Sequence, residues 1–460
     1  MKYANNILEL VGNTPLVKLS RLTAAVKPLV LAKLEYLNPG GSVKDRIGIT
    51  MIEAAEQEGK LKKGGTIVEP TSGNTGVGLA QAAALKGYKC IFVMPDKMSQ
   101  EKIRLLKAYG AEVVITPTAV PKDSPESYYS VADRLSRELP NAFQPNQYAN
   151  MTNPDTHYRT TGPEIWEQTD GKIDVFVAGM GTGGTISGVA KYLKEKNPKV
   201  KIVGVDAEGS LYTGTDIKPY KIEGIGEDFY PATMNLDIVD EMITVSDREA
   251  FVTARHLARE EGILSGGSAG AAVFGAIKVA RRMEKGQTLV VLIPDSGRNY
   301  LSRFYSDEYM KENGFWEPGE AASVGQLLGQ KPHNSGTSVV TVQAEEKVPA
   351  AIDLMRKFNI SQLPVMDGLE MVGSLQETIL MNQIFEDSGA LSQRVRAVMS
   401  EALPTITQDA SINSVYQLLL DGRPAVLVVD HESSPCGIVT KIDLLEHITR
   451  NRETVRAGSN

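Results

Sequence analysis

Residues 12 to about 300 alternate short apolar runs, rich in β-branched residues, with longer amphipathic stretches. The short runs predict six strands, at Ile67–Glu69, Cys90–Val93, Val113–Ile115, Val175–Ala178, Ile202–Val205 and Leu289–Ile293. Gly48–Glu58 and Gln100–Tyr109 are examples of the amphipathic stretches and predict helices between the strands. This alternation is typical of a doubly wound α/β body, which binds its ligands at the carboxyl ends of the strands.

A different pattern begins after residue 316. Residues 317–337 mix Pro, Gly and polar residues and are predicted to be a linker. Beyond them a strand–helix–strand–strand–helix pattern occurs twice at roughly sixty-residue spacing, which predicts one module over 338–390 and a second over 391–460. Units of this size cannot each bury a good core alone, so we expect the two modules to pack as a pair.

Composition and charge narrow the class of protein. The 460 residues are 42% hydrophobic, and the two cysteines lie far apart without metal-ligand spacing, so we expect a reducing cytoplasm, no disulfide and no metal. The N-terminus lacks the apolar core of a signal peptide, and no long apolar run follows, so neither export nor membrane spanning is expected. With 49 basic and 56 acidic residues, a net charge of −7 and no basic block, nucleic-acid binding is disfavoured.

One early segment, Asn38–Arg46, reads Asn-Pro-Gly-Gly-Ser-Val-Lys-Asp-Arg and places a lone lysine between a Gly-rich turn and a helical run. A lysine forms imines and moves protons when it is desolvated or lies near cations, and a turn-to-helix junction fixes the direction of its stem. Taken alone, this motif favours a solvated lysine at an ordinary helix start. A catalytic role for Lys44 therefore depends on the rest of the chain.

A second Gly-rich segment, Gly179–Thr185, follows the predicted strand at Val175–Ala178 and precedes a predicted helix. Glycines allow backbone N–H groups to converge on an anion, the helix N-terminus adds positive potential, and threonine hydroxyls can donate hydrogen bonds. The segment lacks the Lys-Ser or Lys-Thr of an ATP phosphate loop, and it lacks the first-strand placement of a dinucleotide fold. It therefore predicts a phosphate site made by Gly181, Thr182, Gly183, Gly184 and Thr185.

Two further loops have chemistry that suits an amino acid and an aromatic cofactor. The loop Thr71–Gly76 offers Thr71, Ser72 and Thr75 to a carboxylate and Asn74 to a phenolic oxygen, although a plain helix cap would use the same residue types. The loop Ser265–Gly270 carries Ser268. A neutral serine facing a pyridine nitrogen would leave it unprotonated, which favours elimination and replacement at the β-carbon over transamination.

These four motifs, in this order and spacing, resemble the fold-type II (tryptophan synthase β-like) pyridoxal phosphate enzymes, specifically the cystathionine β-synthase family of the bacterial type. The C-terminal pair is similar to the tandem βαββα CBS modules of the same family, so the resemblance covers nearly the whole chain. It implies pyridoxal 5'-phosphate as cofactor and condensation of L-serine with L-homocysteine to L-cystathionine and water, with hydrogen sulfide release as a side activity. Cysteine synthase (O-acetylserine sulfhydrylase) shares most of the motifs and stays an alternative.

The resemblance also implies a role for each matching residue. Lys44 matches the lysine that holds the cofactor and abstracts the α-proton, and Gln147 matches a second contact to the substrate carboxylate beside Thr71, Ser72 and Thr75. The cofactor contacts fall on Asn74 for the ring hydroxyl, Gly181, Thr182, Gly183, Gly184 and Thr185 for the phosphate, and Ser268 for the pyridine nitrogen.

Gly226 and Glu227 lie where the family has a loop near the second substrate. Animal and fungal enzymes carry a tyrosine at the position of Glu227, so a tyrosine role cannot be transferred. The chain also begins directly on the catalytic body, without the haem-ligating extension of the animal enzymes, and we expect no haem.

In the second C-terminal module, Thr440 and Asp443 match a ribose-binding Thr-x-x-Asp, while the first module has Gln376 and Ile379 instead. The resemblance therefore implies one adenosyl site per chain, with S-adenosylmethionine as the effector, unless the modules only mediate dimerisation. A homodimer or homotetramer is expected. A third possibility is an adenosyl-ligand sensor whose enzyme scaffold is inactive.

Overall fold

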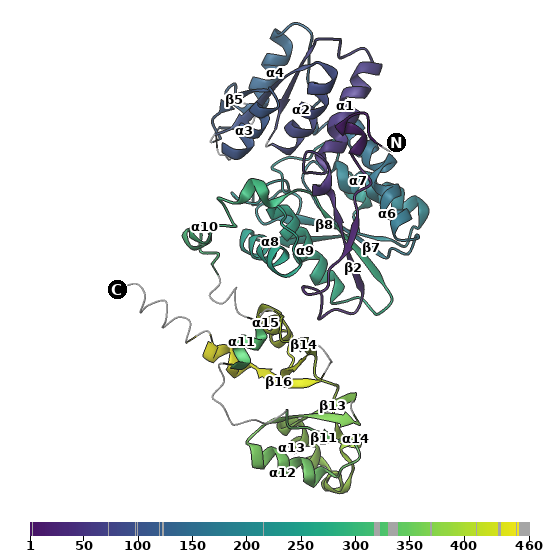
Figure 1. The fold of residues 1–460 in the computed structure, drawn as a ribbon, viewed down its shortest axis with the longest axis vertical. Helices are drawn as coiled ribbons and strands as arrows, with labels where there is room; N and C mark the ends of the chain where they lie inside the picture. The colour runs from purple at the N-terminus through teal and green to yellow at the C-terminus, as the bar shows by residue number, and fades with distance from the viewer. Residues whose placement is uncertain are drawn as a thin grey trace, which may run out of the picture. The chain divides into compact units, whose positions relative to one another are not determined.

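The computed structural model describes residues 1, 3–71, 73–96, 98, 100–118, 120–121, 124–214, 216–316, 323–329, 339–368, 370–410, 412–430, 434–447 and 449. The chain divides into two compact units, an N-terminal unit of residues 1–316 and a C-terminal unit of residues 317–460 (Figure 1). Within the described residues, no helix combines the length and the apolar character needed to cross a membrane.

The N-terminal unit contains a six-stranded sheet, ordered β1-β2-β10-β7-β8-β9, and a separate four-stranded sheet, ordered β5-β4-β3-β6. All neighbouring strands are parallel except the antiparallel pair β1 and β2. The strands are β1 Leu16–Lys18, β2 Leu29–Leu34, β3 Thr66–Pro70, β4 Lys89–Pro95, β5 Glu112–Thr116, β6 Ala142–Phe143, β7 Val175–Gly179, β8 Lys201–Ala207, β9 Glu241–Val245 and β10 Thr288–Ile293. All six predicted strands are confirmed, and they are divided between the two sheets.

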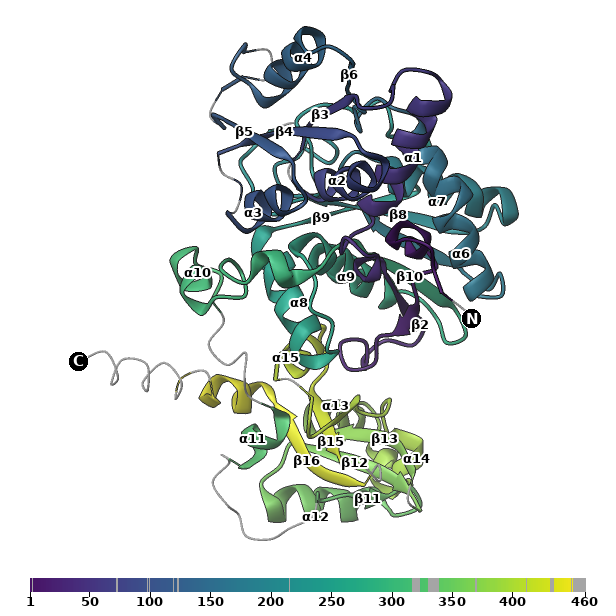
Figure 2. The ribbon, with the colours of Figure 1, turned by 45° about the horizontal axis from the view of Figure 1, so that its top comes forward.

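Helices cover both faces of each sheet (Figure 2). Apolar side chains of α1, α2 and α3 pack on one face of the four-stranded sheet and those of α4 on the other, while α8 and α9 cover one face of the six-stranded sheet and α6 and α7 the other. The α-helices are α1 Lys44–Gln57, α2 Asn74–Lys86, α3 Gln100–Ala108, α4 Tyr128–Glu138, α5 Thr152–Arg159, α6 Thr161–Gln168, α7 Gly184–Lys196, α8 Asp247–Glu260, α9 Gly267–Ala280 and α10 Asp307–Glu312. Short 3-10 helices occur at η1 Ile7–Leu10, η2 Glu35–Leu37, η3 Leu236–Ile238 and η4 Gly297–Tyr300.

Helices α1 and α2 touch at a pair of glycines. A Cβ added to Gly48 would lie 2.3 Å from the backbone of Gly78, and a Cβ added to Gly78 would lie 2.6 Å from the carbonyl oxygen of Lys44. Contacts this short leave no room for any side chain, so only glycine fits. The close crossing fixes the first turn of α1, and therefore the backbone of Lys44, against α2.

The C-terminal unit has two three-stranded sheets, β11-β12-β13 and β14-β15-β16, each with one parallel and one antiparallel pair. Its strands are β11 Val342–Gln343, β12 Gln362–Asp367, β13 Glu370–Gln376, β14 Thr405–Thr407, β15 Ala425–Val429 and β16 Pro435–Thr440, and its helices are α11 Val324–Gly329, α12 Val348–Phe358, α13 Glu377–Glu386, η5 Ser388–Ser392, α14 Val395–Val398 and α15 Ile412–Leu420. The predicted repeat is therefore present, and the first strand of the first module is only two residues long, Val342–Gln343.

The predicted linker, 317–337, contains helix α11, whose buried side chains belong to the second module. Val324 and Leu327 pack in one core cluster with residues of β14, α15 and β15, and the Val324 N–H donates to the carbonyl oxygen of Ala410 at 2.9 Å. The Pro- and Gly-rich flanks led to the prediction of a linker here. A single apolar turn gives no strong helix signal of its own, because it becomes stable only against a tertiary partner.

The boundary predicted between residues 390 and 391 also differs from the packing. Val395 and Val398 of α14 lie in the core cluster of the first module, with residues of α12, β12 and β13. The Val395 N–H donates to the carbonyl oxygen of Glu346 in that module at 2.8 Å. Helix α11, which precedes the first module, therefore packs on the second, and helix α14, which lies in the range predicted for the second module, packs on the first.

Candidate active site

Lys44 is the first residue of α1 and lines two neighbouring cavities of the N-terminal unit. The preceding turn uses Gly41, at φ +86°, and the Lys44 N–H donates to the hydroxyl of Ser42 at 3.2 Å. Burial lowers the pKa of the Lys44 amine, although the negative charges of Asp295 and Glu227 oppose the shift. An amine with a lowered pKa can act as a nucleophile and a proton carrier near neutral pH.

The first cavity is narrow and lies at the junction of β7 and α7. It is lined by Lys44, Thr182 and Thr185 together with backbone of Gly181 and Gly183. Side chains could not replace the glycines, because an added Cβ would lie 2.6 Å from the Gly224 carbonyl oxygen at Gly181, 2.5 Å from Met234 at Gly183 and 2.0 Å from Asn153 at Gly184. Bare backbone N–H groups and two hydroxyls at a helix N-terminus make this cavity an anion site, which we call the phosphate cradle.

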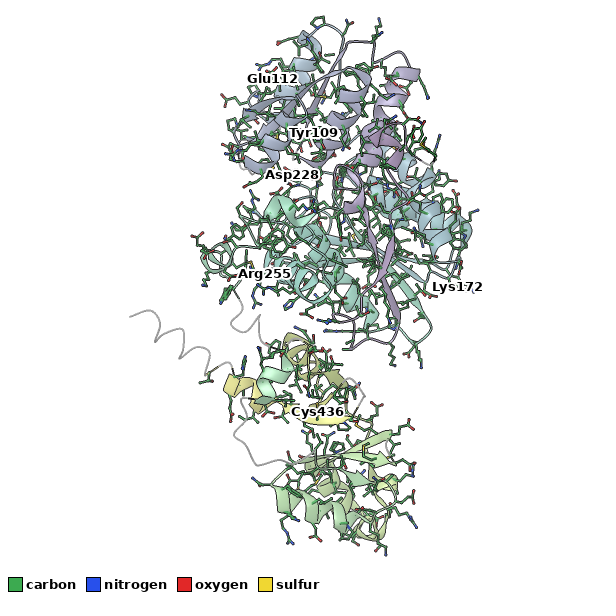
Figure 3. All side chains as sticks on the ribbon, in the orientation of Figure 1. Tyr109, Glu112, Lys172, Asp228, Arg255 and Cys436 are labelled. Atoms are coloured by element: carbon green, nitrogen blue, oxygen red, sulfur yellow. The ribbon has the colours of Figure 1, made fainter. Side chains whose placement is uncertain are left out.

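The second cavity, of about 670 Å³, lies beside the cradle and shares Lys44 and Thr182 with it. Its size falls within the range of small-molecule sites. Asp228, labelled in Figure 3, lies in its wall, between the parts of the N-terminal unit that contain the two sheets. The sequence-predicted residues that line it are Lys44, Asn74, Thr75, Gln147, Thr182, Gly226 and Glu227, and the aromatic residues are Tyr128, Tyr129, Tyr148, Tyr220 and Tyr309.

The predicted substrate loop begins at the carboxyl end of β3. Thr71 accepts a hydrogen bond from the Gly73 N–H at 3.1 Å, and Thr75 donates to the Oε1 of the buried Gln147 at 2.6 Å. Ser72 lies outside the described residues. The structure therefore brings Thr75 and Gln147 together across 72 residues of sequence.

Glu69, at the end of β3, was missed by the sequence reasoning. Its carboxylate accepts the N–H groups of Asn146 at 2.8 Å and Gln147 at 2.9 Å, and so holds the turn that carries Gln147. Burial raises the pKa of Glu69 to about 7, although these two hydrogen bonds oppose the shift. A polar residue at the end of a buried strand was the available signal.

Asp295, which follows β10, was also missed. Its Oδ2 accepts hydrogen bonds from Asn74 at 2.9 Å and from the Tyr300 hydroxyl at 2.7 Å. Its Oδ1 is buried and has no hydrogen-bond partner among the described residues. Ser268, in the first turn of α9, is 4% exposed.

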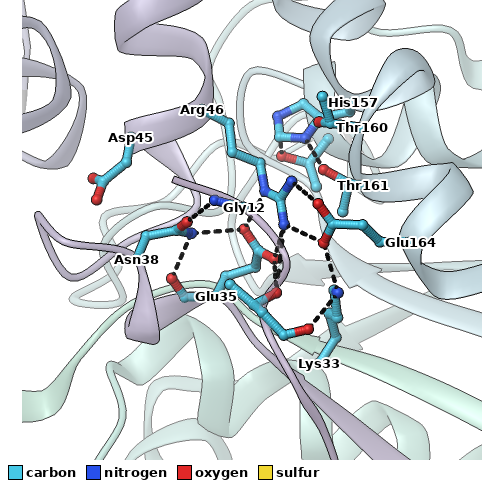
Figure 4. A network of polar contacts seen from close by, with 12 residues as sticks. Gly12, Lys33, Glu35, Asn38, Asp45, Arg46, His157, Thr160, Thr161 and Glu164 are labelled. Carbon is cyan, nitrogen blue, oxygen red and sulfur yellow. Dashed lines mark hydrogen bonds and ion pairs between the residues drawn. The ribbon is translucent and has the colours of Figure 1, made fainter. Parts of the chain in front are cut away.

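Arg46 lies at the centre of a buried charge network two residues after Lys44 (Figure 4). Its guanidinium donates to both carboxylate oxygens of Glu35 at 2.7 and 2.8 Å and to both of Glu164 at 2.7 Å. Glu164 also accepts from Lys33 at 2.8 Å. Burial alone would raise the pKa of Glu164, but the hydrogen bonds and charges of Arg46 and Lys33 lower it to about 2. The network ties the first turn of α1 to η2 and α6.

In the C-terminal unit, the N–H and the hydroxyl of Thr440 both donate to Asp443 Oδ2 at 2.7 Å. The two residues predicted to bind ribose therefore lie side by side. In the described part of both units, no cluster of three or more His, Cys, Asp or Glu side chains could hold a metal ion.

The residues around Lys44 fit pyridoxal phosphate. The cradle suits its phosphate, the amine suits its aldehyde, and the adjoining cavity has room for an aromatic ring with an amino acid. The tightly packed glycines of the cradle keep its backbone N–H groups uncovered by side chains, which is what a bound phosphate requires.

Comparisons with known proteins identify the family. A family model described as "Pyridoxal-phosphate dependent enzyme" matches residues 7–295, and one described as "CBS domain" matches residues 336–385 and 395–450. The cystathionine beta-synthase of Dictyostelium discoideum is 41% identical over 466 residues, covering 98% of this chain and 93% of the relative. That of Oryctolagus cuniculus is 41% identical and covers 97% of this chain and 85% of the relative.

Two solved structures resemble the chain with a TM-score of 0.63 each. A hydrogen sulfide-producing enzyme from Fusobacterium nucleatum is 42% identical and covers 65% of this chain and 100% of its own. An O-acetylserine dependent cystathionine beta-synthase from Helicobacter pylori is 39% identical and covers 66% of this chain and 99% of its own. The motifs, the fold and these similarities agree, and the chain belongs to the cystathionine β-synthase family of pyridoxal-phosphate-dependent enzymes.

Proposed function

We propose that this chain catalyses β-replacement, condensing L-serine with L-homocysteine to L-cystathionine and water. The observation that carries the proposal is the position of Lys44, a partly buried amine of lowered pKa at the point where an anion cradle opens into a cavity large enough for a second substrate. The relatives named cystathionine beta-synthase support the choice of reaction.

In this proposal the chain's own residues hold the cofactor and move one proton. Thr182, Thr185 and the cradle N–H groups would bind the phosphate, Asn74 the ring oxygen and Ser268 the pyridine nitrogen. Once bound, pyridoxal phosphate withdraws electrons from the α-carbon of an attached amino acid. Lys44 Nζ would remove the α-proton, the β-hydroxyl would leave as water with the proton that the homocysteine thiol gives up, and Lys44 would return its own proton to the α-carbon after the thiolate has added.

The two amino acids would occupy different parts of the large cavity. Thr71, Ser72, Thr75 and Gln147 form the proposed site for the carboxylate of the first. The segment with Gly226 and Glu227 faces the second. Position 226 requires glycine, because its φ is +78° and an added Cβ would lie 2.7 Å from the ring of Tyr220. The Glu227 carboxylate would attract the ammonium group of homocysteine rather than its carboxylate.

The leaving group distinguishes this reaction from its main alternative, cysteine synthesis from O-acetylserine and sulfide. The Helicobacter pylori structure, described as O-acetylserine dependent, favours testing that donor with homocysteine as well. The Fusobacterium nucleatum enzyme supports hydrogen sulfide release as a side activity.

The test is a rate matrix of serine or O-acetylserine against homocysteine or sulfide. We expect cystathionine from homocysteine, with a Glu227→Gln variant losing homocysteine saturation while keeping sulfide turnover. A Lys44→Ala variant should abolish every product. Rapid cysteine formation from O-acetylserine and sulfide, without cystathionine from either donor, would overturn the proposal, and so would a purified chain that takes up no cofactor.

We further propose that S-adenosylmethionine binds the second C-terminal module through Thr440 and Asp443. The adjacent placement of the two side chains supports a paired contact with ribose hydroxyls. Calorimetric titration of the full chain should give one site, which Asp443→Ala removes and the matched change in the first module, Gln376→Ala, leaves intact. Two sites, or one site insensitive to Asp443→Ala, would refute this assignment.

A further inference from the structure

Two side chains of helix α5 contact the two threonine hydroxyls of the phosphate cradle. The Asn153 amide donates to Thr182 Oγ1 at 3.3 Å, and His157 Nε2 lies 3.2 Å from Thr185 Oγ1. Asn153 and His157 are four residues apart and so lie on one face of the helix. Both are buried, with exposures of 1% and 0%. No role follows for either residue from the motifs that identify the cradle.

The packing of α5 on α7 is too close to be adjusted. A Cβ added to Gly184 would lie 2.0 Å from the Asn153 side chain, and one added to Gly188 would lie 2.1 Å from the Pro154 carbonyl oxygen and 2.9 Å from the His157 Cβ. The two helices therefore hold Asn153 and His157 at fixed distances from the cradle.

A threonine hydroxyl has one hydrogen, so the protein group that it already hydrogen-bonds decides whether that hydrogen can still be donated to a ligand. Burial, with the nearby charges of Arg46 and Lys44, lowers the pKa of His157, so the ring is neutral and has one donor and one acceptor nitrogen. Its Nδ1 lies 2.8 Å from the Thr161 hydroxyl, a contact drawn in Figure 4. A Thr161 hydroxyl that donates to Nδ1 places the histidine hydrogen on Nε2, facing Thr185.

In that arrangement the Thr185 hydroxyl accepts a hydrogen bond from His157 Nε2, and its own hydrogen can be donated to a phosphate oxygen bound in the cavity. The opposite tautomer would use up the Thr185 hydrogen and present only lone pairs to an incoming phosphate, whose oxygens are acceptors. Asn153 acts in the same sense on Thr182, because its amide donates to the hydroxyl oxygen. The same amide also donates to the Gln147 carbonyl oxygen at 2.9 Å, which fixes its orientation.

We propose that Asn153 and His157 are positioning residues that fix the Thr182 and Thr185 hydroxyls as hydrogen-bond donors toward the cofactor phosphate. The proposal rests on the assignment of the cradle to that phosphate, but not on the identity of either amino-acid substrate. It therefore stands or falls by cofactor binding, whichever thiol the enzyme uses.

The experiment measures binding of pyridoxal phosphate to the full chain after the cofactor has been removed, by quenching of tryptophan fluorescence. Inorganic phosphate is titrated separately, by the shift in melting temperature. His157→Phe keeps a ring of similar size but no hydrogen bond, and we expect it to weaken pyridoxal phosphate binding roughly ten- to a hundredfold, as for loss of one bond to a charged group. His157→Gln keeps a donor near the Nε2 position and should recover most of the affinity.

Two comparisons separate positioning from general damage. In a Thr185→Ala background, His157→Phe should add no further loss, because the hydroxyl that it orients is gone. His256 is a second buried histidine and does not line the cradle. Its Nδ1 lies 2.6 Å from Glu260 Oε1, within hydrogen-bond distance. His256→Phe should change the melting temperature without changing cofactor affinity.

The phosphorus NMR shift of the bound cofactor gives a readout that folding alone would not move, and it should change in His157→Phe but not in His256→Phe. Unchanged affinity in His157→Phe would overturn the proposal. Equal losses in His157→Phe and His157→Gln, or an undiminished loss in the Thr185→Ala background, would assign the effect to packing and overturn it as well.

Discussion

Replacing Arg46 by methionine tests how strongly the buried charge network stabilises the N-terminal unit. The Arg46 side chain is 2% exposed and that of Glu35 is 0% exposed, so the change leaves the Glu35 carboxylate buried without its cation. Breaking a buried ion pair from one side typically costs about 3–5 kcal/mol. We expect a loss of that size in the free energy of unfolding, since Lys33 still compensates Glu164 but lies nearer to that residue than to Glu35.

Urea unfolding followed by tryptophan fluorescence is the suitable assay, because both tryptophans, Trp166 and Trp316, lie within residues 1–316 and report that unit alone. The matched control is Arg159→Met. Arg159 pairs with Asp155 at 2.8 Å, but the two side chains are 73% and 45% exposed. An exposed pair contributes less than about 1 kcal/mol, so this variant should unfold close to the parent.

The double variant Glu35→Gln, Arg46→Met identifies the physical cause. It removes the uncompensated charge, so it should recover part of the stability lost in Arg46→Met. If Arg46→Met unfolds like Arg159→Met, or if the double variant is worse than the single one, then charge burial does not explain the role of this network.

Further predictions concern the helix crossing and the buried carboxyl groups. Gly78→Ala would force the carbonyl of Lys44 away from α2, so we expect turnover to fall more than tenfold while the chain stays folded by circular dichroism. Burial raises the pKa of Asp45 and of Glu69 to about 7 from ordinary values near 4, so each carboxyl binds its proton more tightly when folded. The stability that each contributes is complete below pH 4 and is lost as the pH rises through 7. Urea unfolding should therefore show a decline in the free energy of unfolding between pH 5 and 7.5, and Asp45→Asn or Glu69→Gln should each flatten it.

The cradle could be predicted from the sequence because its chemistry is local. Gly181–Thr185 carry their glycines and hydroxyls within one turn, and the preceding β-branched strand marks where that turn lies. Lys44 could be proposed for the same reason, although its own motif was not sufficient without the other loops.

Residues that act through distant partners gave no comparable signal. Asp295 meets Asn74 across 221 residues and Glu69 meets Gln147 across 78, and no periodicity links such positions. The division of the strands into two sheets could not be predicted for a related reason. An apolar run shows that a strand is buried, but it does not show which strand is its neighbour.

The packing of α11 and α14 has a consequence for attempts to separate the two modules of the C-terminal unit. A cut at residue 390 would remove α14 from the core of the first module and separate α11 from the second module on which Val324 and Leu327 pack. Neither half would then keep its whole apolar core. We therefore expect the two modules to melt in a single cooperative transition, and a fragment with only one of them to aggregate, despite a sequence repeat that suggests two independent pieces.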